Sequence, residues 1–173
     1  MPEHYHYVRE TFYNNNGKFG SDIIEYILYN DNKLIGSMIH DFYENRSVIK
    51  YKEDRLVFIK NWFSAELKSK NTGKVIARFK DSHTKLIIND PPENYIVSIG
   101  NSQLYKNKWQ YKLHGQYSET TIEVKKELPP NTSIRLIPFF GNIHIKGKVN
   151  FLAILMSFIS LEQMIYLEVI SSD

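Results

Sequence analysis

The chain has 173 residues, 42% of them apolar and 24% charged, which is the composition of a folded domain and excludes a disordered chain. One domain spanning residues 1–173 is sufficient for this length. The absence of cysteine excludes disulfides, thiolate metal sites and cysteine nucleophiles. The formal net charge is only +3, but residues 46–85 hold 11 Lys or Arg against 4 Asp or Glu, a local net charge of +7.

The N-terminal segment predicts a β-strand. Tyr5, Tyr7 and Arg9 occur at every second position, so they share one face of an extended chain. His4 and His6 would share a face as well, but no third ligand follows at a suitable spacing, which favours a solvated or hydrogen-bonded pair over a metal site. The segment lacks the basic stretch and apolar run of a signal peptide, so we expect a cytoplasmic location.

Short apolar or β-branched runs, separated by turn-forming residues, continue along most of the chain. Clear hairpin turns are expected at 30–33 and 71–73, where Asn, Asp and Gly tolerate a positive φ. Trp62 and Phe63 are interpreted as core residues that close a barrel, or alternatively as part of a ligand surface. The expected strands are 5–10, 23–29, 34–40, 47–51, 56–63, 65–70, 75–80, 86–88, 95–99, 104–105, 109–114, 121–127, 133–139 and 143–146.

One helix is predicted, from Asn150 to about Tyr166. Its residues 151–161 are apolar apart from two serines, so the helix has no polar face and must be buried on all sides. Asn150 is a suitable N-cap, and Glu162 marks the point where the apolar character changes. The apolar span is too short to cross a bilayer. A final strand is predicted at 165–170.

These elements predict a mainly β fold, a closed antiparallel barrel of about twelve strands around a buried C-terminal apolar helix. Closure is expected because a uniformly apolar helix has to be enclosed. A pleckstrin-like sandwich capped by a C-terminal helix is the alternative, but the helix of such a sandwich has one wet face.

No pattern of residues argues for catalysis. The chain contains no glycine-rich phosphate loop, no nucleophile elbow and no His-Glu-x-x-His motif. Asp41 and Glu44 are near each other in sequence, but carboxylates in a polar loop are usually solvated. We therefore expect no enzymatic activity, no cofactor, no metal and no nucleic-acid partner.

Two segments carry a resemblance to a known family. Lys33 to Gly36 and Lys74 to Ala77 repeat the pattern Lys-aliphatic-Ile-small after a turn, and an apolar segment starts at Phe151. The chain resembles the tubby C-terminal-like domains, specifically small bacterial proteins related to phospholipid scramblases and plant LURP-one-related proteins. This resemblance implies a twelve-stranded barrel around a C-terminal helix, and binding to phosphoinositides or membranes. Scramblase activity does not carry over, because the chain has no palmitoylation cysteine and no separate spanning segment.

The basic central section supplies the candidate binding residues. Positive charge gathered on neighbouring strands attracts anionic phospholipid head groups, so we expect a non-catalytic module at a membrane surface. The alternative is a structural or protein-interaction domain in which these residues only face solvent. A barrel that carries a small apolar ligand is disfavoured, because the helix would fill the lumen. The candidate residues are Lys60, Lys68, Lys70, Lys74, Arg78 and Lys80.

Overall fold

The computed structural model describes residues 4–13, 22–41, 44, 46–60, 65–81, 83–100, 108–125 and 139–171. These residues form twelve strands and one helix. The elements are β1 (Tyr5–Tyr13), β2 (Asp22–Asn30), β3 (Lys33–Asp41), β4 (Arg46–Tyr51), β5 (Asp54–Lys60), β6 (Ala65–Ser69), β7 (Val75–Lys80), β8 (Lys85–Asn89), β9 (Pro92–Gly100), β10 (Lys108–Gly115), β11 (Ser118–Lys125), β12 (Phe139–Gly147) and α1 (Phe151–Ser171).

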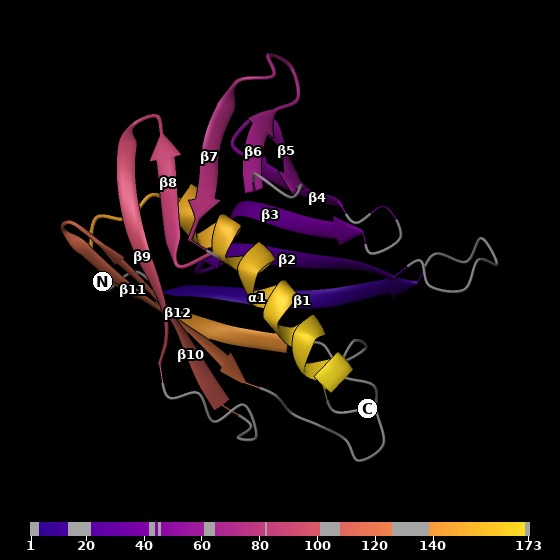
Figure 1. The fold of residues 1–173 in the computed structure, drawn as a ribbon. Coiled ribbons are helices and arrows are strands. Elements are labelled where there is room, and N and C mark those ends of the chain that lie inside the picture. Colours follow the sequence, from indigo (N-terminus) through magenta and orange to yellow (C-terminus); the bar gives the residue numbers. More distant parts are fainter. Residues whose placement is uncertain are drawn as a thin grey trace.

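The strands form a closed antiparallel barrel. Each strand pairs with its neighbours in the chain, and β1 pairs with both β2 and β12, which closes the ring (Figure 1). The predicted fold class is confirmed, and the ring excludes the pleckstrin-like sandwich. Closure leaves no unpaired strand edge, which is the usual site of edge-to-edge aggregation.

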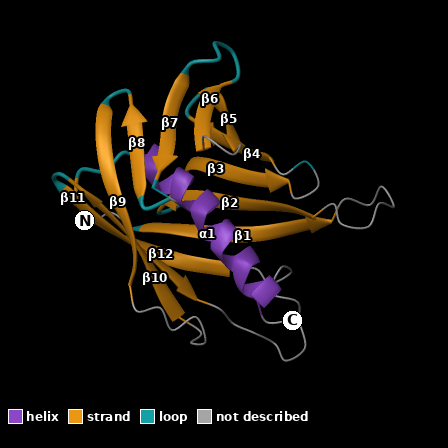
Figure 2. Cartoon of the chain, in the orientation of Figure 1, coloured by secondary structure: helices purple, strands orange, loops and turns teal. Residues whose placement is uncertain are grey.

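The two ends of the barrel are distinct. Because the strands alternate in direction, the connections 31–32, 52–53, 70–74, 90–91 and 116–117 all lie at one end, which we call the tight-turn end. Strand β12 also finishes there, so α1 starts at this end. The helix then crosses the barrel toward the opposite end (Figure 2).

The turn residues explain the geometry of the tight-turn end. Asp31 has φ 49° and Gly73 has φ 69°, as the predicted hairpin turns require. Gly147 has φ 80°, and a Cβ atom at this position would lie 2.1 Å from the carbonyl oxygen of Tyr117. Only glycine therefore fits where the chain leaves β12 for the helix.

The start of the helix is fixed by hydrogen bonds. The Asn150 side-chain oxygen accepts a bond from the Leu152 N–H at 3.0 Å, which confirms the predicted N-cap. The Asn150 N–H donates to the Tyr95 hydroxyl at 3.0 Å, which connects the helix start to β9. All residues of α1 from 152 to 162 are buried, as predicted.

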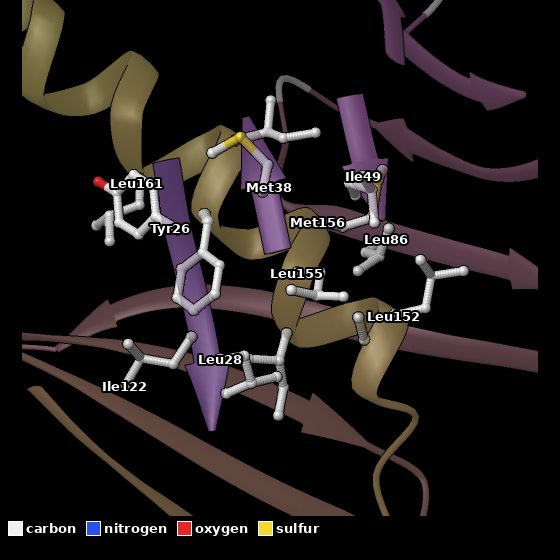
Figure 3. Packing of buried hydrophobic residues seen from close by; sticks show 14 of the residues in the cluster. Tyr26, Leu28, Met38, Ile49, Leu86, Ile122, Leu152, Leu155, Met156 and Leu161 are labelled. Carbon is white, nitrogen blue, oxygen red and sulfur yellow. The ribbon is translucent and has the colours of Figure 1, made fainter. Parts of the chain in front are cut away.

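The helix packs closest to β3 and β4. A Cβ atom on Gly36 would lie 2.9 Å from Leu155 Cδ1 and 2.7 Å from the Lys50 carbonyl oxygen, so glycine permits this approach. On the β1–β2 side, the Phe158 ring lies 5.1 Å from Tyr7 and 4.8 Å from Tyr26, measured between ring centroids. Figure 3 shows the helix side chains among residues of several strands, including Leu28, Met38, Ile49, Leu86 and Ile122.

Two predictions about the elements are wrong. The break expected between the strands 133–139 and 143–146 is absent, because Gly141 and Asn142 pair with β1 and β12 runs without interruption from Phe139 to Gly147. The segment 165–170 is not a strand, because α1 continues to Ser171. Glu162 was interpreted as the point where the buried helix ends, but its charge is compensated inside the barrel and the helix continues past it. Trp62, Phe63 and the predicted strand segments 104–105 and 133–138 lie outside the described residues.

Replacing Leu155 with Asp tests the buried helix. The Leu155 side chain is fully buried, so an unpaired carboxylate there costs several kcal/mol, comparable with the whole stability of a domain. We expect the variant to be unfolded or insoluble by near-ultraviolet circular dichroism. Leu34→Asp, at a site that is 60% exposed, is the matched control and keeps the parent spectrum. A folded Leu155→Asp variant would show that the helix can leave the lumen.

Candidate functional site

The six predicted cations lie on three consecutive strands, β5, β6 and β7, and on the turn between β6 and β7. Leu67, Ala77 and Phe79 point into the core, so the alternating positions Lys68, Arg78 and Lys80 face outward. We call the full set the cationic wall: Lys60, Lys68, Lys70, Lys74, Arg78 and Lys80.

The structure spreads these cations along the height of the barrel. Lys70 and Lys74 lie at the tight-turn end, whereas Lys60 and Lys80 end their strands at the opposite end. Lys68 and Arg78 lie between them along β6 and β7. The six residues therefore follow one side of the barrel and do not converge on one point.

Two of the cations have carboxylate partners. Lys68 Nζ lies 3.2 Å from Glu66 Oε2 on the same strand, and Lys74 Nζ lies 3.8 Å from Asp90 Oδ2 in the next turn. Both pairs are partly or fully exposed, and such ion pairs contribute little to stability. A competing anion could therefore displace these carboxylates at small cost.

Arg78 is placed differently from the lysines. It lies opposite Glu66 across β6–β7 and opposite Ile87 across β7–β8. Its Nε atom is buried and has no hydrogen-bond partner in the described part of the chain. A buried donor without an acceptor costs about 1–3 kcal/mol.

Lys60 acts on a neighbouring histidine. Burial lowers the pKa of His83, and the positive charge of Lys60 lowers it further. The His83 ring packs edge-on against Phe79 with a centroid distance of 4.8 Å. The His83 backbone has φ 70°, so this turn holds a bulky residue in the left-handed region.

Sequence reasoning missed three further cations beside the wall. Lys50 and Arg55 lie directly opposite each other across β4–β5, and both are exposed. Lys85 lies opposite Lys80 across β7–β8 and forms an ion pair with Asp81 at 2.8 Å. The short gap between the expected strands 47–51 and 56–63 was the signal that could have paired Lys50 with Arg55.

A second polar cluster lies inside the barrel. Glu162 of α1 accepts bonds from Arg9 Nε to Oε2 at 2.9 Å and from Arg9 Nη2 to Oε1 at 2.9 Å. The Tyr26 hydroxyl donates to Oε2 at 2.8 Å. Arg9 is 0% and Glu162 is 3% exposed, so this is a buried bidentate ion pair between the helix and the first strand.

Contacts within this cluster keep Arg9 charged and Tyr26 protonated. Burial acts to lower the pKa of Arg9, but Tyr26 and Glu162 outweigh it and the pKa is raised, so the guanidinium stays charged. Burial and the Glu162 charge raise the pKa of Tyr26, so its hydroxyl stays protonated and remains a donor. Sequence reasoning missed this cluster, although Arg9 shares a face with the apolar rings of Tyr5 and Tyr7.

His40 lies on the same side of the lumen as the cluster of Arg9, Tyr26 and Glu162. Its Nδ1 is 2.9 Å from the Ser47 Oγ on the neighbouring strand. Burial lowers the pKa of His40, and the negative charges of Glu162 and Asp41 act in the opposite direction. The imidazole is therefore neutral at pH 7.

The other residues considered from the sequence form no reactive arrangement among the described residues. The rings of His4 and His6 lie 5.6 Å apart, and His6 stacks on Tyr29 at 5.2 Å. Asp41 accepts a bond from the Glu44 N–H, and the Glu44 side chain pairs with Arg46 at 3.7 Å. No three His, Asp or Glu side chains within the described ranges are grouped to hold a metal.

No family profile, curated protein or solved structure matches this chain. The physical arrangement of its residues is therefore the basis for a functional assignment. Across the described ranges, no helix has the length and apolar character needed to cross a membrane.

A double-mutant cycle tests the buried ion pair. Arg9→Met or Glu162→Leu alone leaves a buried charge without its partner, so we expect each to lower the free energy of unfolding by about 3–5 kcal/mol. The double variant, with both charges removed, should be more stable than either single variant. Urea unfolding measures all four proteins. Additive losses in the double variant would show that the two side chains do not depend on each other.

The buried imidazole predicts a pH dependence of stability. Because the pKa of His40 is lowered from 6.5 in the folded state, the unfolded state binds more protons below about pH 6.5. The free energy of unfolding should fall as the pH falls through this range, by at most about 1.4 kcal/mol per pH unit for one proton. His40→Gln should reduce the slope, whereas His4→Gln, at an exposed site, should not. An unchanged slope in His40→Gln would assign the titration to other groups.

Proposed function

We propose that this chain is a tubby C-terminal-like domain that binds anionic membrane surfaces, without catalysis, through cations of the cationic wall. The supporting observation is the surplus of positive charge on the outer faces of β4 to β7. In the described part of this surface, Glu66 and Asp90 are the carboxylates that pair with residues of the wall.

The electrostatic cost of placing cations next to one another on this surface supports an external anion as their partner. Like charges directly opposite each other on a sheet are destabilising, and Lys50 and Arg55 are such a pair. Neither forms an ion pair with a described residue. Lipid phosphates beside this pair, which flanks the 52–53 connection, would reduce the repulsion.

The architecture supports the same proposal. A twelve-stranded closed barrel with a C-terminal helix inside it is the fold that the resemblance to tubby C-terminal-like domains implies. The helix fills the lumen, so a ligand has to bind outside. The outer wall is where cations are concentrated.

Vesicle sedimentation tests this function. We expect the protein to bind vesicles of phosphatidylcholine with phosphatidylserine at low salt, and to bind pure phosphatidylcholine much less. Raised salt should release it, because exposed charges are screened over about 10 Å at 0.1 M ionic strength. Equal binding to both vesicle types would contradict an electrostatic site.

Substitution of all six residues of the cationic wall by Gln tests the site. Each Lys or Arg near an anionic surface contributes about 1 kcal/mol, so the loss of even two contacts lowers partitioning about thirtyfold. We expect the variant to lose binding while its circular dichroism spectrum stays that of the folded parent. Full binding by a folded six-fold variant would place the membrane site elsewhere. Failure of the parent to bind any of these vesicles would instead favour a protein-interaction domain.

A further inference from the structure

Among the described residues, the two most exposed large apolar side chains lie at the tight-turn end. Tyr117 is 81% exposed and Leu34 is 60% exposed, the largest values among the large hydrophobic residues of the described chain. Both belong to hairpins at the tight-turn end. Of the other two described residues of this kind, Ile59 is the residue before the last of β5, toward the opposite end, and Ile96 lies in the middle of β9.

These hairpins are evenly distributed around the ring. In the strand order of the ring, two strands separate each of the hairpins β2–β3, β6–β7 and β10–β11 from the next. Their tips carry Leu34, the pair Lys70 and Lys74, and Tyr117. Three tips spread around one rim define a plane across the barrel axis, as a flat surface would require.

The tips are held firmly. The Asp31 N–H donates to the His4 carbonyl at 2.8 Å, and the Ser69 N–H donates to the Lys74 carbonyl at 3.0 Å. The Tyr117 carbonyl lies against Gly147 with no room for a side chain. Exposed apolar side chains on rigid tips lose little conformational entropy on binding.

Among the five hairpin connections at this end, one has a surplus of positive charge. The β6–β7 turn carries Lys70 and Lys74 and no carboxylate, whereas 52–53 holds Lys52 beside Glu53, and the other charged residues of these connections are Asp31 and Asp90. Of these, Asp90 lies 3.8 Å from Lys74. Lys148, between β12 and α1, adds one positive charge. An anionic surface would therefore be attracted mainly at the β6–β7 tip, and the apolar tips would contribute the remaining contact.

We propose that the barrel docks on an anionic bilayer with its tight-turn end, an inference that rests on the proposed function. Lys70 and Lys74 contact lipid phosphates, and Leu34 and Tyr117 enter the region between head groups and acyl chains. Tyrosine suits this depth because its ring is apolar and its hydroxyl can stay hydrated. The helix axis then points away from the membrane, and Lys60 and Lys80 face solvent.

Site-specific labelling tests this orientation, and the natural absence of cysteine makes it direct. Leu34→Cys, Tyr117→Cys and the control Gln110→Cys, an exposed site toward the opposite end of β10, each carry one environment-sensitive fluorophore. On addition of phosphatidylserine-containing vesicles, we expect a blue shift at positions 34 and 117 and none at 110. A shift at 110, or none at 34 and 117 while the protein sediments with vesicles, would overturn the orientation.

Two charge-matched variants give an independent readout. Lys70→Gln/Lys74→Gln should lower partitioning into these vesicles about tenfold to thirtyfold at low salt. Lys60→Gln/Lys80→Gln removes the same charge from the opposite end of the wall and should change it less than twofold. Equal losses would overturn end-on docking but leave the proposed function standing. Failure of the parent protein to bind these vesicles would overturn both.

Discussion

The ion pair between Arg9 and Glu162 is the constraint on which the placement of the helix depends. An apolar helix in an apolar lumen gains almost the same burial after a small rotation or shift, since the hydrophobic effect has no direction. The bidentate contact and the Tyr26 hydroxyl do have a direction. They fix the depth and rotation of α1 relative to β1 and β2, and a single polar contact fixes register in coiled coils for the same reason.

Most of the fold could be predicted from local patterns, and the errors arise where one residue had to be assigned without its partner. The burial of the helix, its N-cap at Asn150 and the hairpins followed from periodicity and turn chemistry. Glu162 was interpreted as the edge of the buried segment, because an isolated carboxylate indicates solvent. Its partner Arg9 lies 153 positions away in the sequence, so no local pattern could show that the charge is compensated. Because Glu162 was interpreted as the end of the buried segment, residues 165–170 were wrongly predicted to form a separate strand.

The candidate site could be predicted in composition but not in shape. The charge count identified the cations of β5 to β7, and strand alternation placed Lys68, Arg78 and Lys80 on the outer face. Their heights along the barrel depend on which strand ends share a rim, and this follows only from the closed topology. The irregular register between Leu67 and Lys68 also lies outside what alternation can predict. For these reasons the sequence suggested one patch where the structure has a line of charges.

The position of the helix in the chain has a consequence for biosynthesis. All twelve strands are translated before α1, and at about 5–20 residues per second this takes roughly 10–30 s. During that interval the inward-facing side chains of the strands have no helix to cover them. The barrel therefore depends on the cell keeping a large apolar surface out of contact with other chains until residue 162 is available to meet Arg9. Termination between β12 and α1 would release a polypeptide that has every strand but lacks the helix side chains of the core, a natural substrate for chaperones and proteases.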